Sequence, residues 1–96
     1  MLRVGLDLID IARVARARER FGARFDARLF TPQEIALCRG NVQRLAARIA
    51  AKEAAVKALG CGIGDVTWTE VEITHDARQR PILNLHGKAA QIAAEL

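Results

Sequence analysis

The first residues of the chain alternate between apolar side chains and polar or small ones. Apolar residues occupy the even positions from Leu2 to Leu8, and Asp7 lies among the odd positions. Successive side chains of a strand point to opposite faces, so a period of two is typical of a half-buried strand. The pattern predicts a strand over residues 2–9, with Asp7 on the face opposite the apolar residues.

A helical period replaces this alternation after Asp10, whose residue type commonly caps helix N-termini. Gly22 is expected to interrupt the helix, because glycine is a poor helix former. The segment is therefore predicted to form two short helices. Four apolar residues share the flank that should face the core: Ile11, Val14, Phe21 and Phe25.

The next helix is indicated by its first residues. The run Thr31-Pro32-Gln33-Glu34 combines a capping threonine, a proline suited to the first helical position and a glutamate that completes a capping box. This helix should be short and end near Gly40.

The longest helix is predicted from Asn41, a capping residue, to Leu59, with Gly60 as its C-terminal stop. Lys52 falls in the middle of the apolar stripe of this helix, and Glu53 lies at the edge of the stripe. The stripe itself comprises Val42, Leu45, Ile49, Val56 and Leu59.

Alternation returns in the last third of the chain and predicts strands over residues 66–74 and 82–86, joined by a polar turn as a hairpin. Residues 88–96 are predicted to form a short amphipathic helix. The order of elements favours an α+β fold, an antiparallel sheet with helices packed mainly on one side, in a single domain of residues 1–96.

Composition narrows the class of protein. Hydrophobic residues make up 51% of the 96 positions, which excludes a disordered chain. Charges interrupt every apolar run and acids lie within the N-terminal one, so we expect neither a membrane span nor a secretory signal and place the protein in the cytoplasm. Cys38 and Cys61 are expected to be buried free thiols.

The excess positive charge is confined to one segment. Between Ile11 and Arg28 there are six arginines against Glu19 and Asp26, and six minus two equals the whole net charge of +4. At about 100° per residue, four of these arginines share one helix face: Arg13, Arg16, Arg20 and Arg24. Such a face suggests an acidic partner; the alternative is a solvated face that keeps the protein soluble.

Asp7 and Glu53 are candidate metal ligands, because each lies in an otherwise apolar segment where a charge needs a partner. Magnesium takes one or two carboxylates and shares phosphate oxygens with a substrate. The alternative is that Asp7 caps a turn and Glu53 pairs with Lys57, four residues later on the same helix.

The run from Arg48 to Gly60, with its Lys52-Glu53-Ala54 core and Lys57-Ala58 beyond, resembles the signature helix of phosphopantetheinyl transferases of the holo-acyl-carrier-protein synthase type. The Gly5-Leu6-Asp7 opening, the Phe30-Thr31-Pro32-Gln33-Glu34 segment and the hairpin around Pro81 resemble further family motifs. The resemblance covers nearly the whole chain.

The resemblance implies magnesium-dependent transfer of the phosphopantetheine group of coenzyme A to a serine of an acyl carrier protein, in support of fatty acid biosynthesis, by a homotrimer. It implies that Asp7 and Glu53 hold the metal and that Glu53 and Lys57 are catalytic. The residues implied in coenzyme A binding are Arg48, Lys57, Gly60 and Gly62. Arg13, Arg16, Arg20 and Arg24 would bind the carrier protein.

The sequence departs from the family pattern at two places. The family's hairpin carries a glycine two residues before the proline, where this chain has Gln79, and its C-terminal Ser-x-Ser-His segment is not found in these 96 residues. Two alternatives to the enzyme therefore stay open. One is a module that binds carrier protein or coenzyme A without turnover. The other is nucleic-acid binding through the arginine helix, which is disfavoured by the small number of aromatic residues.

Overall fold

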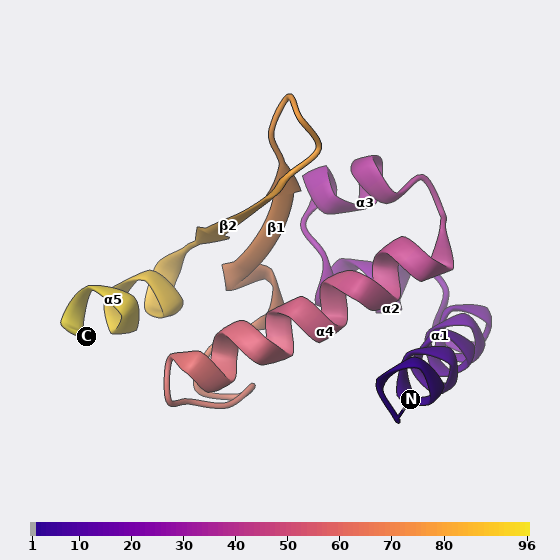
Figure 1. Cartoon of the computed structure of the whole chain (residues 1–96), viewed down its shortest axis with the longest axis horizontal. Helices are drawn as coiled ribbons and strands as arrows, with labels where there is room; N and C mark the ends of the chain where they lie inside the picture. The colour runs from indigo at the N-terminus through magenta and orange to yellow at the C-terminus, as the bar shows by residue number, and fades with distance from the viewer. Residues whose placement is uncertain (1) are drawn as a thin grey trace.

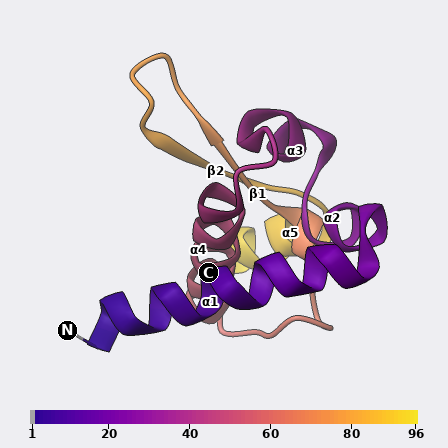
Figure 2. The same ribbon diagram turned by 90° about the vertical axis from the view of Figure 1, so that its right-hand side faces the viewer.

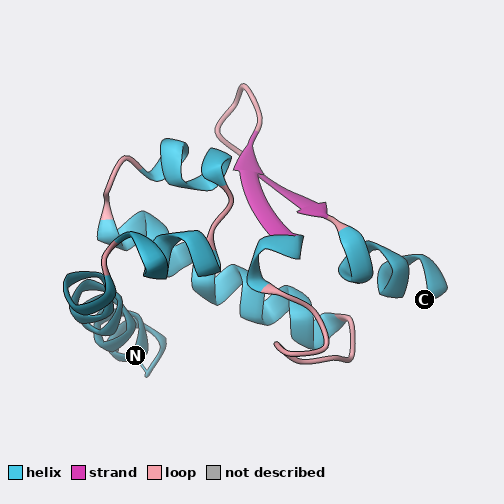
Figure 3. Cartoon of the chain, turned by 180° about the vertical axis from the view of Figure 1, so that it is seen from behind, coloured by secondary structure: helices cyan, strands magenta, loops and turns pink. Residues whose placement is uncertain are grey.

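A computed structural model describes the backbone of residues 2–96 and the side chains of residues 11–96. The described residues form five α-helices, one short 3₁₀ segment and a two-stranded antiparallel hairpin whose turn projects beyond the helices (Figures 1 and 3), so the predicted α+β class is confirmed. The elements are α1 (Leu2–Phe21), α2 (Ala23–Leu29), α3 (Pro32–Cys38), α4 (Val42–Ala58), η1 (Trp68–Glu70), β1 (Val71–His75), β2 (Pro81–Leu85) and α5 (Gly87–Glu95).

The first segment is helical where the alternating pattern predicted a strand, so the strand over residues 2–9 is wrong for this structure. A strand needs a neighbour to bond its backbone groups, whereas a helix bonds its own. β2 occupies one edge of β1, and side chains occupy the other: Ile73 donates its N–H to Glu34 and accepts from Arg48. The described chain therefore offers residues 2–9 no place beside β1.

Gly22 separates α1 from α2, as predicted, and adopts a left-handed conformation with φ of 58°. Phe21, the last residue of α1, remains 55% exposed, contrary to expectation. Val14 is buried, and Ile11 and Phe25 pack against the same core. Figure 2 shows α1 crossing α4, with which it makes its main contact.

The caps of α3 and α4 form as predicted. Thr31 accepts the backbone N–H of Glu34, and Glu34 accepts the N–H of Thr31 in return. Asn41 caps α4 by accepting the N–H of Arg44. These bonds satisfy amide groups that would otherwise lack partners at helix starts.

The hairpin pairs Val71 with Leu85 and His75 with Pro81 at its two ends. Its first strand is shorter than predicted, because residues 68–70 form η1 instead. Residues 71–74 are all buried, so β1 is covered on both faces and lacks the exposed face that its alternation suggested.

The core consists of two clusters that share α4. One joins α1, α2, α3 and the first half of α4 around Phe30, Cys38 and Leu45. The other joins the end of α4 to β1 and α5 through Val56, Val71 and Ala89, with Cys61 partly buried against it. Cys38 and Cys61 are free thiols, but only Cys38 is fully buried. Among the described residues, no helix has both the length and the apolar character needed to cross a bilayer.

Candidate functional site

Glu53 and Lys57 lie one turn apart on the exposed side of α4 and line the same surface hollow, of about 350 Å³, called here the Lys57 hollow. The opposite wall comes from the loop after α4 and from η1. The structure thus brings together three of the predicted site residues, Glu53, Lys57 and Gly62. The other lining side chains used below are Val56, Ile63 and Trp68.

Glu53 also lines a second hollow, of about 220 Å³, between α1 and α4. Arg13 lies in this hollow together with Val14, Phe25 and Ile49. Glu53 therefore stands between the arginine-bearing helix and the Lys57 hollow. The negative charge of Glu53 therefore faces the arginine-bearing helix α1 on one side. On the other side it faces the Lys57 hollow, whose wall carries the positive charge of Lys57.

The i, i+4 ion pair between Glu53 and Lys57, one of the two alternatives, is not among the ion pairs that the described side chains form. The Glu53 carboxylate is exposed and offers the hard oxygen donors that magnesium takes. Its chemistry fits this metal. The side chain of Asp7 lies outside the described residues, and those described contain no cluster of three or more His, Cys, Asp or Glu.

Arg48 is 5% exposed and is bound to β1, away from the side chains that line the Lys57 hollow. Its Nε donates to the carbonyl of Ile73 at 3.1 Å, and Nη2 lies 3.1 Å from Nδ1 of His75. A guanidinium only donates, so Nδ1 accepts and the neutral His75 ring carries its proton on Nε2. The expected contact of Arg48 with coenzyme A stays a prediction.

The glycines after α4 have separate roles. Gly60 ends the helix with φ of 75°, a conformation that favours glycine. Gly62 lines the Lys57 hollow and donates its N–H to the Asp65 carboxylate at 3.1 Å. The loop is thereby held against the end of α4.

The arginine face is divided between two helices. Arg13, Arg16 and Arg20 lie exposed on α1, while Arg24 lies exposed on α2, beyond the break at Gly22. The single helix face that was expected to carry all four is therefore a two-helix surface. Arg18 is not part of it, because its guanidinium pairs with Asp26 at 3.0 Å.

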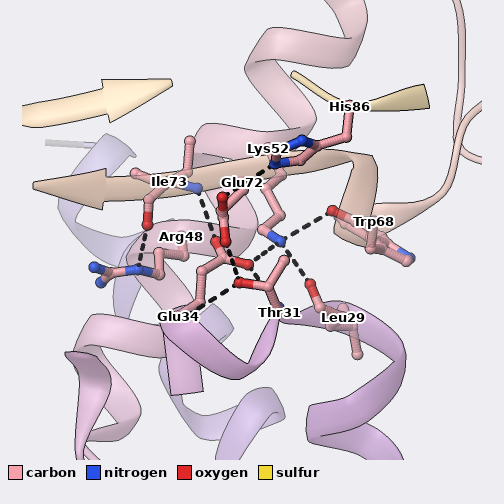
Figure 4. A network of polar contacts seen from close by, with 9 residues as sticks. All are labelled: Leu29, Thr31, Glu34, Arg48, Lys52, Trp68, Glu72, Ile73 and His86. Carbon is pink, nitrogen blue, oxygen red and sulfur yellow. Dashed lines mark hydrogen bonds and ion pairs between the residues drawn. The ribbon is translucent and has the colours of Figure 1, made fainter. Parts of the chain in front are cut away.

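Lys52 is the centre of a polar network that sequence analysis did not assign (Figure 4). Its side chain is 0% exposed, and Nζ donates to three acceptors. They are the Leu29 carbonyl at 2.7 Å, Glu34 Oε1 at 2.6 Å and the Trp68 carbonyl at 3.0 Å. A lysine in the middle of an apolar stripe was the available signal. Its partners come from three other segments of the chain.

Glu34 links this centre to β1. It accepts from Thr31 and Lys52 with Oε1 and from the Ile73 N–H with Oε2, at 2.9 Å. The capping glutamate of α3 thus also fixes the edge of the sheet. Loss of hydration on burial lowers the pKa of Lys52, and the hydrogen bond and charge of Glu34 oppose this effect.

Glu72, on β1, extends the network to α5. The Thr31 hydroxyl donates to one of its oxygens, and His86 Nε2 lies 3.1 Å from the other. The Thr31 hydrogen bond, aided by His86, lowers the pKa of Glu72 below its ordinary value of 4.5. Glu72 therefore stays ionised in the folded chain at neutral pH.

Comparison with known proteins places this arrangement in a family. A family model described as the 4'-phosphopantetheinyl transferase superfamily matches residues 3–96. The chain is 46% identical over its full length to the holo-[acyl-carrier-protein] synthase of Koribacter versatilis, covering 80% of that protein. It is 48% identical to the one of Herpetosiphon aurantiacus, covering 81%.

Solved structures agree with these sequence matches. Helicobacter pylori holo-[acyl-carrier-protein] synthase in complex with coenzyme A superposes with a TM-score of 0.79 at 30% identity, over 86% of this chain and 74% of that one. The Neisseria meningitidis enzyme gives 0.78 at 36% identity, over 88% and 71%. The family expected from the signature helix is confirmed. This chain belongs to the 4'-phosphopantetheinyl transferase superfamily.

Proposed function

We propose that the protein transfers the 4'-phosphopantetheine group of coenzyme A to a serine of an acyl carrier protein. The observation that carries the proposal is the full-length match at 46–48% identity to proteins named holo-[acyl-carrier-protein] synthase. The grouping of Glu53, Lys57 and Gly62 around one hollow supports it, because these residues belong to the segment that carries the family resemblance.

In this reaction the serine oxygen forms a bond to the phosphorus that bears the pantetheine arm. The pyrophosphate P–O bond breaks, and adenosine bisphosphate leaves. Catalysis of such a transfer depends mostly on positioning and on neutralising charge. Lys57, exposed on the wall of the hollow, would bind a phosphate oxygen, and the hydroxyl proton would pass to Glu53 or to water.

Magnesium is the proposed cofactor, held by Glu53 and Asp7. When bound, it would withdraw charge from the pyrophosphate and stabilise the leaving group. Glu53 suits this task because its carboxylate is exposed at the hollow. Arg48 and Gly60 remain proposed contacts of coenzyme A.

The carrier protein is proposed to bind the arginine surface of α1 and α2. Arg13 lies in the hollow that Glu53 also lines, so a partner seated on Arg13, Arg16, Arg20 and Arg24 would present its serine near Glu53. Charge complementarity of this kind mainly raises the association rate and fixes orientation. A homotrimer in the cytoplasm that serves fatty acid biosynthesis is the setting proposed for this reaction.

The direct test incubates the purified chain with magnesium, labelled coenzyme A and an apo acyl carrier protein, and measures the mass of the carrier. We expect the carrier to gain one phosphopantetheine group. Glu53→Ala and Asp7→Ala should each lower the rate by on the order of 100-fold or more, because bound metal supplies several kcal/mol of transition-state stabilisation.

Glu53→Ala should keep the urea unfolding midpoint of the unchanged chain, since Glu53 is exposed. Full activity of either variant at saturating magnesium would contradict the metal assignment. Binding of coenzyme A and carrier protein without any product would contradict the transferase and favour a binding module.

A further inference from the structure

The ammonium group of Lys52 ties α4 to three segments that come together only in the fold. Leu29 is the last residue of α2, Glu34 lies in the first turn of α3, and Trp68 begins η1. All three donor positions of the ammonium are used, and no buried side-chain nitrogen or oxygen among the described residues lacks a partner. This one group therefore joins each of the three segments to α4 by a hydrogen bond.

The hydrogen bond from Lys52 to the Trp68 carbonyl connects this network to the proposed functional site. Trp68 lines the Lys57 hollow opposite Glu53 and Lys57. It also lines a neighbouring hollow of about 340 Å³ that holds Arg28 and Thr67. Lys52 Nζ binds the Trp68 carbonyl at 3.0 Å, and Glu53 is the next residue of α4. One hydrogen bond thus joins the helix that carries the proposed catalytic groups to the wall that faces them.

A buried ion pair is a costly way to obtain stability alone. Apolar residues of similar size often replace such a pair with no loss of stability, because burying two charges costs as much as their attraction returns. The Lys52 and Glu34 side chains are both 0% exposed. The hydrogen bond to the Trp68 carbonyl, in contrast, needs a donor at position 52, so an apolar side chain there cannot replace it.

We propose that Lys52 is a positioning residue that sets the width of the Lys57 hollow by holding Trp68 against α4. This inference rests on the proposed function, since the hollow is taken to receive the phosphate-bearing end of coenzyme A. Lys52 does not touch the substrate. It acts through the Trp68 wall and through the placement of Glu53 and Lys57.

The test separates positioning from stability with three variants. Lys52→Met removes the donors and leaves Glu34 buried without its cation. Lys52→Met combined with Glu34→Gln also removes the unpaired charge. Leu85→Ala is the control, because Leu85 packs in the second core cluster, which does not include Trp68, and lines neither hollow that contains Trp68.

Three measurements are made on each variant: the urea unfolding midpoint, the fluorescence of Trp68, and the steady-state constants for transfer. Trp68 is the only tryptophan in the chain, so its emission and its quenching by acrylamide report on the surroundings of this one residue. The double variant should regain much of the midpoint lost in Lys52→Met. Its Trp68 emission should still lie at longer wavelength and be quenched more strongly than in the unchanged chain.

The same double variant should show a KM for coenzyme A raised roughly 10-fold, because small misplacements in a binding site have large effects. Its KM for carrier protein should change less than about twofold, since three of the four arginines of that surface lie on α1, to which Lys52 makes no hydrogen bond. Leu85→Ala should lose stability while keeping both the Trp68 emission and the KM for coenzyme A.

Recovery of the Trp68 signal and of the KM in the double variant would overturn the inference, because Lys52 would then serve stability only. An equal rise in the KM of Leu85→Ala would overturn it as well. If the unchanged chain transfers nothing, the proposed function fails by itself. The Trp68 measurement then still decides whether Lys52 holds the wall.

Discussion

Two adjacent residues of α4, Lys52 and Glu53, lie on different faces of the helix, one buried and one exposed. Lys52 is 0% exposed, and Glu53 is exposed at two hollows. The 100° step between successive helical residues separates them, so that the cation serves the interior and the carboxylate faces outward. Of these two neighbours in sequence, Lys52 therefore joins segments in the interior, whereas Glu53 is exposed and free to take part in the proposed reaction.

Gln79 adopts a left-handed backbone conformation, which favours glycine. It adopts φ of 63° in the hairpin turn, where its N–H donates to the Asp76 carbonyl at 3.0 Å. This left-handed conformation favours glycine, the residue that the family pattern carries at this place. Gln79 in place of this glycine therefore lowers the stability of the hairpin turn.

Replacing Gln79 by glycine should stabilise the chain by about 0.5–1 kcal/mol, since the relief of left-handed strain exceeds the entropy that glycine loses on folding. Urea unfolding at neutral pH measures the change. Gln79→Ala, which keeps the Cβ, should give no gain, and a gain equal to that of glycine would contradict the explanation.

At the scale of elements, short polar contacts decide how helices meet the hairpin. Thr31 caps α3 and also donates to Glu72 on β1, and Glu72 in turn contacts His86 at the start of α5. Lys52 adds a nearby positive charge. Three elements are thereby linked through one ionised carboxylate with a side chain that is 11% exposed.

The lowered pKa of Glu72 makes this link depend on pH. The folded state favours the ionised form, so the stabilisation is fully present above the ordinary pKa of 4.5 and is lost as pH falls through the lowered pKa of the folded chain. Glu72→Gln should therefore cost about 1–2 kcal/mol at pH 7. It should also make the loss of stability in acid shallower.

Urea unfolding at neutral pH and at several values in the acid range checks this expectation. Glu95→Gln, which removes an exposed carboxylate of α5, is the control and should keep the steeper loss. If Glu72→Gln lost stability in acid as steeply as the unchanged chain, other carboxylates would account for that loss. Glu70 and Asp76, whose pKa values are also lowered, would then be the first to replace.

Sequence patterns predicted some of these elements correctly and others wrongly. The capping box at Thr31, the cap at Asn41 and the hairpin are confirmed, because each depends on residues close together in the chain. The expected first strand is wrong, since a strand requires a partner that no local pattern specifies. Phe21 was expected in the core but is exposed, because a helical period assigns a residue to a face and does not specify which distant segments cover that face.

The whole molecule exposes more surface than a compact monomer of its mass. Its accessible surface is 6720 Å², whereas a folded 10.5 kDa monomer is expected to expose about 5,400 Å². Ile82 and Leu83 on β2 are 40% and 49% exposed. Apolar surface of this kind favours association, which supports the proposed trimer.

Light scattering after size exclusion should therefore give about three times the chain mass of 10.5 kDa at micromolar concentration. Dilution should lower this mass and the thermal midpoint together, because assembly stabilises by mass action. A constant mass of one chain over the same range would contradict the trimer and leave the assignment to the family intact.

The sequence alone determined the helix starts at Thr31 and Asn41, the hairpin, and the signature that identifies the family, since these depend on neighbouring residues and on residue type. Tertiary structure alone decided that Lys52 is a buried tie, because its partners Leu29, Glu34 and Trp68 lie 23, 18 and 16 positions away. It likewise decided the state of residues 2–9. The physical reason is that caps and turns are stabilised by bonds within a few residues, whereas burial and strand pairing are set by whichever distant segments the fold brings alongside.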